Sequence, residues 1–340
     1  MKKEFITQPD ESVIEISTWC YDYEKQSTGS GWYEAKDGGL VFIAWGKCAK
    51  TFDEGETAEI TDAPMGMSSN NVRLKDGRLM TVCEEAVPAP GYDFNHKNFY
   101  AYFSDDDGKT FGNRVVITEN SRRLFLMNAR TVRLSTGRII VPMAVHPAEL
   151  YDEKHETVGW AGAFWSDDEG QTWQEGEWKA PAVVDQLCEP VICEMADGTL
   201  KMMARTGRGH LYMLDSTDGG KTWSDEYATT LRSPCAPFIF SYDPYSEQYV
   251  VVWDNSFPGT HHLYPRTPIC IGVSKDCKKW KTVCELGNEP NGSYGYPSIT
   301  FTENAILMGY YISAQRGFGK GNRVHMVKLM RDQSPLLKVK

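Results

Sequence analysis

Residues 188–205, CEPVICEMADGTLKMMAR, carry a carboxylate and a guanidinium whose spacing could bring them together. Two apolar runs flank the Asp197-Gly198 turn, which predicts a β-hairpin. The return strand then places Arg205 within one residue of opposite Glu189, at about 5–8 Å by strand geometry. Such a pair suits proton transfer or the binding of an anion, and it can equally be a structural salt bridge.

A second group of titratable side chains lies in the segment 84–98, EEAVPAPGYDFNHKN. This connection is long for a β protein, and long loops often carry functional residues. Asp93 and His96 stand within it, and Glu84 and Glu85 open it. Each of these side chains could act as a general acid or base. A loop aspartate without a chemical role is the alternative.

A repeated octet of the form S-x-D-x-G-x-T-[WF] carries further aspartates. It reads SDDDGKTF from Ser104, SDDEGQTW from Ser166 and STDGGKTW from Ser216, with a decayed copy, SKDCKKW, from Ser274. The Ser and Asp side chains of such a segment accept backbone N–H groups inside a tight turn, and the glycine supplies a positive φ. We therefore predict that these aspartates form turns and take no part in catalysis.

The elements that must position these residues are β-hairpins. Six hairpin patterns occur at 32–46, 72–82, 132–142, 191–203, 238–252 and 298–311. In four of them the hairpin is followed by a third strand, an octet and a fourth strand. Six four-stranded units predict an all-β, six-bladed β-propeller that forms one domain over residues 1–340. Because the ring must close, the strand near residues 12–18, SVIEIST, is expected to pair with the last blade.

Composition limits the partners. The 36 basic and 46 acidic side chains give a formal net charge of −10, which argues against nucleic acid or an anionic membrane as the partner. An anionic ligand would need a local cluster of arginines. The 10 Trp, 17 Tyr and 14 Phe residues suit both β structure and sugar binding.

The N-terminal segment and the cysteines bear on compartment. The first 15 residues contain no apolar run, which predicts a cytoplasmic protein without a signal peptide, or a secreted one if a leader has been removed. The nine cysteines are an odd number without CxxC spacing, so we expect buried thiols in place of disulfides or a zinc site.

The three good octets, in register with the hairpins, resemble the Asp boxes of the sialidase (neuraminidase) superfamily over about residues 60 to 330. The resemblance implies a propeller whose active site lies on the axis. It also implies three arginines that bind a substrate carboxylate, a Tyr nucleophile activated by a Glu, and an Asp acid/base. No metal or organic cofactor is expected.

Matching the motifs one by one assigns these roles. The family pattern places its Glu and one Arg at Glu189 and Arg205. In RTPICIGVSKD, Arg266 stands eight residues before Ser274, where the family carries another arginine. In YGYPSITF, Tyr296 takes the place of the nucleophile, with Tyr294 as a near competitor.

The acid/base and the first arginine are less well matched. The resemblance assigns the acid/base role to Asp93, with His96 and Glu84 or Glu85 as alternatives. The family's first arginine falls on Met67, whose thioether cannot bind a carboxylate. Arg130 is the candidate replacement, and a salt bridge is its alternative role.

The resemblance therefore implies a glycoside hydrolase similar to exo-α-sialidases, which cleaves a terminal sialic acid or related acidic sugar through a retaining Tyr-nucleophile mechanism. Two alternatives remain. The first is a propeller glycosidase for a uronic or neutral sugar, which the methionine at position 67 favours. The second is a non-catalytic glycan-binding propeller. All three imply a glycan or small sugar as the partner.

Overall fold

The computed structural model describes residues 1–23, 30–44, 46–64, 67–86, 97–119, 123–126, 130–146, 159–256, 266–290, 292–313 and 322–339. Nearly all of the regular structure in these ranges is β. The helices among these residues are two 3₁₀ turns, η2 (Arg331–Gln333) and η3 (Pro335–Leu337). Within the same ranges, no helix has the length and apolar character that a bilayer crossing requires.

The chain divides into two compact units. The first comprises residues 1–62, 207–211 and 229–340, and the second comprises residues 63–206 and 212–228. Two sheets lie within the second unit. One has the order β10-β9-β8-β7 and the other is built on β13. Their strands are β7 (Asn71–Arg73), β8 (Leu79–Ala86), β9 (Lys97–Ser104), β10 (Gly112–Thr118), β11 (Leu124–Phe125), β12 (Val132–Arg133), β13 (Ile139–Val145), β14 (Trp160–Ser166) and β15 (Gln174–Glu175).

A third sheet has the order β16-β17-β18-β19. Its first two strands belong to the second unit and carry the predicted Glu–Arg hairpin. The strands are β16 (Cys188–Glu194), β17 (Leu200–Arg205), β18 (His210–Ser216) and β19 (Tyr227–Arg232).

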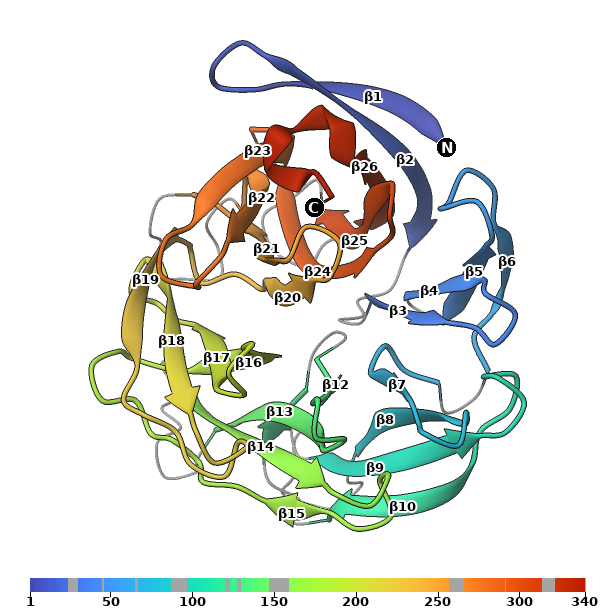
Figure 1. The fold of residues 1–340 in the computed structure, drawn as a ribbon, viewed down its shortest axis with the longest axis vertical. Helices are drawn as coiled ribbons and strands as arrows, with labels where there is room; N and C mark the ends of the chain where they lie inside the picture. The colour runs from blue at the N-terminus through green and yellow to red at the C-terminus, as the bar shows by residue number, and fades with distance from the viewer. Residues whose placement is uncertain are drawn as a thin grey trace. The chain divides into compact units, whose positions relative to one another are not determined.

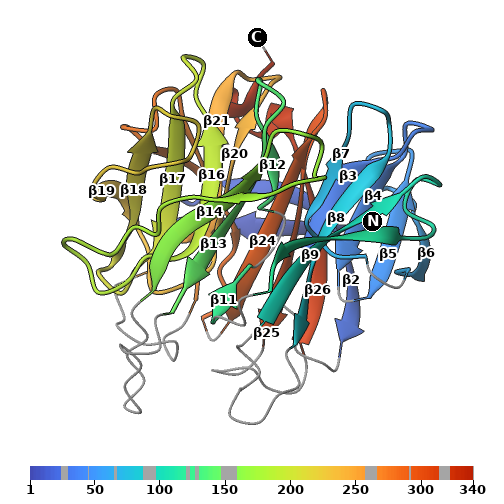
Figure 2. The same ribbon diagram turned by 90° about the horizontal axis from the view of Figure 1, so that it is seen from below.

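Three sheets lie within the first unit, with the orders β3-β4-β5-β6, β20-β21-β22-β23 and β1-β2-β26-β25-β24. Figure 2 shows β24, β25 and β26 as long neighbouring strands of one sheet. The strands of the unit are β1 (Lys2–Thr7), β2 (Val13–Tyr23), β3 (Ser30–Glu34), β4 (Leu40–Ala44), β5 (Lys47–Thr51), β6 (Glu59–Asp62), β20 (Ile239–Asp243), β21 (Gln248–Asp254), β22 (Ile269–Ser274), β23 (Lys281–Gly287), β24 (Ser293–Phe301), β25 (Ala305–Ser313) and β26 (Asn322–Met330).

The described residues thus form six antiparallel sheets, one for each hairpin pattern in the sequence, and the fold class is the predicted six-bladed β-propeller. The predicted closure is also confirmed. Strand β2 pairs with β26, so that Ser17 lies opposite Lys328 and Tyr23 opposite Asn322 (Figure 1). A strand from the N-terminus therefore completes the blade built by the C-terminus.

The octet aspartates form turns, as predicted. In the first octet the Ser104 hydroxyl donates to Asp106 at 2.8 Å, and Asp106 accepts from the Thr110 N–H at 2.8 Å and from the Thr110 hydroxyl at 2.6 Å. The octets at Ser166 and Ser216 repeat these bonds. These carboxylates therefore serve as hydrogen-bond acceptors within their own turns.

The sequence analysis missed one such turn. Thr51 and Asp53 reproduce the octet bonds, with the Thr51 hydroxyl donating to Asp53 at 2.8 Å and the Thr57 hydroxyl donating to Asp53 at 2.7 Å. Threonine stands here in the place of serine, and no Trp or Phe ends the segment TFDEGETA. The first blade therefore has an Asp-box turn that the written pattern excluded.

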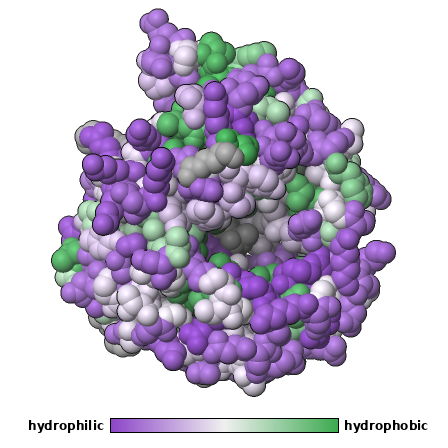
Figure 3. All heavy atoms as spheres, viewed as in Figure 1, coloured by the Kyte–Doolittle hydropathy of each residue, from purple (hydrophilic) through white to green (hydrophobic). Residues whose placement is uncertain are grey.

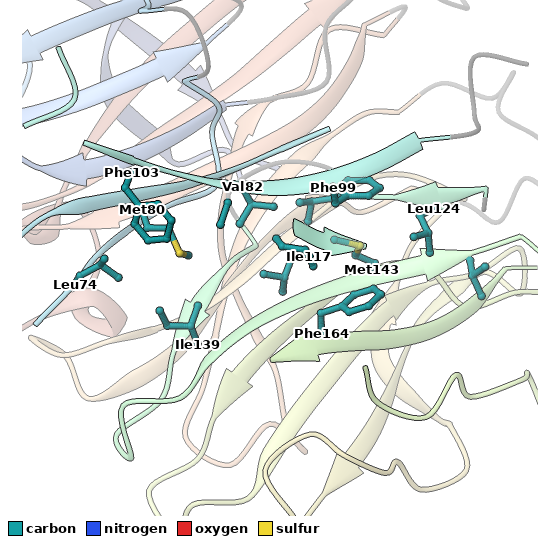
Figure 4. Packing of buried hydrophobic residues seen from close by; sticks show 14 residues of the cluster. Leu74, Met80, Val82, Phe99, Phe103, Ile117, Leu124, Ile139, Met143 and Phe164 are labelled. Atoms are coloured by element: carbon teal, nitrogen blue, oxygen red, sulfur yellow. The ribbon is translucent and has the colours of Figure 1, made fainter. Parts of the chain in front are cut away.

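The core lies between neighbouring sheets. In the second unit, Val82 and Phe99 from one sheet pack with Ile139, Met143 and Phe164 from the next (Figure 4). The cysteines whose side chains are described are buried, apart from the half-buried Cys83. By contrast, the face seen in Figure 3 is coloured mostly for hydrophilic residues. Burial of the apolar side chains on the inner face of each strand is the main force that fixes the register of that strand.

Candidate active site

The predicted Glu–Arg hairpin brings its two charged side chains into contact in the second unit. Cys188 is the Cα partner of Arg205, so Glu189 lies one residue from opposite Arg205, as predicted. The Glu189 carboxylate Oε2 is 3.0 Å from Nη1 of Arg205 and 3.7 Å from Nη2 of Arg130. Glu189 and the two arginines are at most 5 % exposed. One buried carboxylate thus lies against two guanidinium groups.

Arg130 is held in place from two directions. Its backbone N–H donates to the Asn70 side chain at 3.0 Å, and its Nη1 donates to the Pro190 carbonyl at 3.3 Å. The sequence suggested Arg130 either as a substitute for the missing first arginine or as a salt bridge. It forms an ion pair with Glu189, and its charge lies in the same buried cluster as that of Arg205.

The backbone at Glu189 has an unusual conformation. Its φ is 45°, and the pairing of β16 with β17 shifts register between Cys188 and Val191. A positive φ is uncommon for a non-glycine residue, and β-bulges re-aim side chains. Pro190 follows directly, and a residue before proline is disfavoured in the right-handed helical region. The bulge therefore sets the direction of a buried acid.

A histidine and a cysteine adjoin this cluster. Cys188 Sγ lies 3.5 Å from Nε2 of His146, and Phe125 packs edge-on against the His146 ring. Burial, reinforced by the Arg205 charge, lowers the pKa of His146 to about 4. His146 is therefore neutral at pH 7 and adds no positive charge beside Arg205.

The first unit holds the predicted nucleophile in a comparable setting. Tyr296 lies in β24, is 4 % exposed and has a φ of 49°. The pairing of β24 with β25 shifts register between Gly295 and Ser298, and Pro297 follows the tyrosine. The Ser30 hydroxyl donates to the Tyr296 carbonyl at 3.0 Å. Tyr296 thus occupies a bulge before proline, as Glu189 does in β16.

Arg266 and Tyr296 are linked by a residue that the sequence analysis did not single out. Nη1 of Arg266 donates to the Tyr311 hydroxyl at 3.3 Å, and the Tyr311 ring lies 5.8 Å from the Tyr296 ring, centroid to centroid. Gly295 lies opposite Tyr311 in the register, and a Cβ there would come within 2.8 Å of that ring. The glycine before Tyr296 is the sequence signal for this close approach.

A second charged group in the first unit was also missed. Asp254 ends β21, is 1 % exposed, and burial raises its pKa well above its usual range, while the Arg266 charge opposes that rise. A carboxyl buried to this degree is costly to ionise unless it has partners. Burial thus disfavours ionisation of Asp254, which lies beside one of the predicted substrate-binding arginines.

The competing tyrosine has a packing role. Tyr294 is 1 % exposed, and its ring packs edge-on against Tyr310. Its hydroxyl accepts from the Glu289 N–H at 3.4 Å. Tyr296, and not Tyr294, therefore lies beside Tyr311.

Asp93 and His96, the first two acid/base candidates, lie outside the described residues. Glu84 pairs with Lys97, and Glu85 accepts from the Tyr102 hydroxyl and lies 3.2 Å from Arg114. Met67 lines a hollow of about 790 Å³ in the second unit together with Glu84, Glu85 and Tyr102. At the position where the sequence resemblance predicts an arginine, this chain therefore has a thioether that lines a hollow together with two carboxylates.

No grouping of three or more His, Cys, Asp or Glu side chains suited to a metal ion occurs among the described residues. The cluster around Glu189 has two guanidinium groups as its charged neighbours, which repel a cation. The chemistry that these residues can support is proton transfer and anion binding.

Comparison with known proteins gives the family. The BNR repeat-like domain family matches residues 72–309 of this chain. Anhydrosialidase of Macrobdella decora is 32 % identical over 136 residues, which cover 36 % of this chain and 16 % of that protein. Sialidase of Paraclostridium sordellii is 27 % identical over 132 residues, which cover 36 % of this chain and 31 % of that protein.

A solved structure extends the likeness to most of the chain. A Hadza microbial sialidase matches 90 % of this chain and 66 % of its own, with a TM-score of 0.67 at 17 % identity. At that identity the match concerns the fold. The chain spans less than a third of the length of the two sequence relatives and about two thirds of the solved one.

Proposed function

Because this chain belongs to the BNR repeat-like domain family and is a sialidase-like propeller, we propose that it hydrolyses glycosides of sialic acid or a related acidic sugar. The bond cleaved is the one to a terminal sugar, and the anomeric configuration is retained. The proposal extends to this chain the activity that the relatives' names state.

One observation carries the proposal. Among the described residues, nine non-glycine residues have a positive φ, and Glu189 and Tyr296 are those that are buried within a strand. The resemblance of the sequence motifs suggests these same two residues as the nucleophilic pair. Buried strain of this kind is retained where the surrounding structure imposes it, most often at functional sites.

The first chemical step uses this pair. The phenolic oxygen of Tyr296 attacks the anomeric carbon, its proton passes to Glu189, and the bond to the leaving oxygen breaks. A neutral phenol suits an anomeric centre that bears a carboxylate, because an anionic nucleophile would be repelled. Sialidases, with their Tyr nucleophile, are one recognised exception to glycosidases that use two carboxylates.

The second step releases the sugar. In the first step Asp93 gives its proton to the leaving oxygen. In the second step the Asp93 carboxylate takes a proton from the water that attacks the anomeric carbon. The tyrosine leaves as the new bond forms and recovers its proton from Glu189. Two displacements at the same carbon give retention of configuration.

The arginines bind the substrate carboxylate. Arg205 and Arg266 form paired charged hydrogen bonds to it, and Arg130 adds the third cation. Arg130 and Arg205 share Glu189 as a partner, so the carboxylate of the sugar competes with a carboxylate of the protein. The three arginines therefore bind the substrate carboxylate more weakly than three arginines without a carboxylate partner would.

A second candidate function follows from Met67. The hollow that Met67 lines contains Glu84, Glu85 and the Tyr102 ring, groups that accept hydroxyl hydrogen bonds and stack on sugar faces. A glycosidase for a neutral sugar would use such a lining. A uronic acid carries one carboxylate, as a sialic acid does, and is the other alternative to a sialoside.

Turnover of a panel of chromogenic glycosides tests both candidates. The panel holds α-sialosides, β-glucuronides and neutral hexosides, each assayed with wild type, Tyr296→Phe and the matched control Tyr294→Phe. We expect wild type and Tyr294→Phe to cleave the sialosides, and Tyr296→Phe to lose at least about 100-fold in kcat/KM. Cleavage of neutral hexosides alone would favour the second candidate, and no turnover of any glycoside would leave a glycan-binding protein.

A further inference from the structure

A cationic groove lies in the first unit, beside the decayed octet that begins at Ser274. It has a volume of about 570 Å³ and is lined by β22, the turn after it and the C-terminal residues 335–339. Four exposed lysines line it, namely Lys275, Lys279, Lys281 and Lys338. Its described lining residues do not include Glu189, Tyr296 or the three arginines of the proposed reaction.

Comparison with the other octets shows what is unusual about these lysines. At the second position of the octet, Asp167 pairs with Arg138 at 2.7 Å, and the equivalent residue here is Lys275. At the fourth position, Asp107 pairs with Arg73 at 2.5 Å and Glu169 with Arg133 at 2.7 Å. In these two octets, arginines of the preceding hairpins neutralise the acids, and the third octet has the uncharged Thr217 and Gly219 at the two positions.

The fourth octet has lost that neutralisation. Its fourth position is Cys277, which is buried and keeps the positive φ of the turn at 59°. The remaining acid, Asp276, accepts hydrogen bonds from the backbone N–H groups of Lys278 and Lys279 at 2.9 and 3.1 Å. Its carboxylate therefore holds the turn together. None of the four groove lysines forms an ion pair with a described carboxylate.

The four ammonium groups outnumber the single Asp276 carboxylate in the lining, so the hollow has an excess of positive charge that attracts anions. The chain carries a net charge of −10, so the groove is a local reversal of its general field. A bound anionic ligand would neutralise this excess. The groove is therefore suited to a ligand that carries several negative charges.

The lining also selects among polyanions. The described part of the chain contributes no aromatic side chain to the groove lining, and single-stranded nucleic acids are bound largely by aromatic stacking. Duplex DNA presents a dense row of phosphates that a chain of net charge −10 would repel outside the groove. A concave surface does not fit a flat bilayer. Ser246 donates to Asp243 at 2.6 Å and Nε2 of Gln248 donates to the Leu336 carbonyl at 2.7 Å, so the exposed lysines supply the contacts to a ligand.

We propose that this groove binds a segment of an acidic polysaccharide through its carboxylate or sulfate groups. It would hold a polymeric glycan at a site separate from the reacting sugar. This inference goes beyond the proposed hydrolysis, because binding in the groove requires no turnover. Failure of one proposal therefore leaves the other testable.

Binding of heparin and of dextran sulfate, measured by calorimetry at 50 mM and 300 mM NaCl, tests the proposal, with uncharged dextran as the neutral probe. The groove variant is Lys275→Glu/Lys279→Glu/Lys281→Glu. The matched control reverses three exposed lysines elsewhere, Lys2→Glu/Lys36→Glu/Lys221→Glu. Circular dichroism and thermal unfolding establish that both variants are folded.

We expect wild type to bind both polyanions and not dextran, with affinity that falls as salt rises. The groove variant should bind at least about tenfold more weakly, and the control should stay within about threefold. Turnover of a small monomeric sialoside should be the same in the groove variant as in wild type. Equal weakening in both variants, wild-type affinity in the groove variant, or preference for duplex DNA or anionic vesicles over the polysaccharides would overturn the proposal.

Discussion

The hydroxyl of Tyr311 accepts a hydrogen bond from Nη1 of Arg266 at 3.3 Å, while the Tyr311 ring lies 5.8 Å from that of Tyr296. Tyr311 on β25 thus contacts both Arg266, a predicted substrate-binding residue, and the ring of Tyr296, the predicted nucleophile. The hydrogen bond fixes the orientation of the guanidinium, and the ring limits where the Tyr296 ring can lie. These two effects can be separated by removing the hydroxyl alone.

Tyr311→Phe removes the hydroxyl and keeps the ring. We expect the KM for a sialoside to rise about tenfold, because a hydrogen bond to a charged group is worth about 1.5–3 kcal/mol. The kcat should stay within about threefold. Steady-state kinetics check this, with Tyr310→Phe as the control because Tyr310 donates to the Leu286 carbonyl, away from Arg266. An equal rise in KM in both variants would show a general packing effect.

Glu189→Gln removes the carboxylate charge from between two buried guanidinium groups. We expect the free energy of unfolding to fall by about 3–5 kcal/mol, since breaking a buried ion pair leaves its partner's charge in a low dielectric. The double variant Glu189→Gln/Arg130→Met should regain part of that stability and none of the activity. Urea unfolding and kcat/KM together check this. Restored turnover in the double variant would mean that Glu189 acts only as a salt bridge.

The Asp-box carboxylates should stabilise the fold above about pH 4. Hydrogen bonds from Thr110 and Ser104 lower the pKa of Asp106 from 3.8 to about 2, so the folded state holds this group ionised when the unfolded state begins to bind a proton. The stabilisation is complete above pH 3.8 and is lost as the pH falls through 2. Thermal unfolding of Asp106→Asn should differ from wild type at pH 6 and converge with it near pH 2. Asp105→Asn is the control, and a pH-independent difference would contradict the account.

His146 should make stability rise with pH in a higher range. Its pKa is about 4 in the folded state against 6.5 for the free side chain, because burial disfavours the charged ring. Between pH 4 and 6.5 the unfolded state therefore binds a proton that the folded state does not, and stability falls as the pH is lowered. Urea unfolding of His146→Asn should show a shallower loss over this range than wild type. His210→Asn provides the reference, and parallel curves for wild type and His146→Asn would refute the assignment.

The repeating parts of the fold were predictable because each rests on local chemistry. Turn residues at fixed offsets gave the hairpins and the octets, and ring closure required a partner for the last blade, which β2 supplies. The turn at Thr51 was not predicted because the sequence pattern required serine at the first position. Threonine carries the same hydroxyl group and makes the same hydrogen bond.

The site was predictable only as far as the motifs reach. Glu189 and Arg205 follow from hairpin register, which one turn fixes. Tyr311 and Asp254 reach their positions through strand pairings whose register is set by burial over many residues, so their neighbours could not be derived from spacing. The Glu-Pro and Tyr-Pro dipeptides at 189–190 and 296–297 were visible, but their common bulge conformation was not.

The central claim is that Tyr296 forms the covalent bond to the sugar. Incubation with 2,3-difluorosialic acid, whose fluorine at the carbon next to the anomeric centre slows release of the intermediate, followed by proteolysis and mass spectrometry, tests it directly. The account predicts one glycosyl adduct, on the peptide that contains Tyr296, and none in Tyr296→Phe. An adduct on another residue, or rapid sialoside turnover by wild type with no adduct at Tyr296, would contradict it.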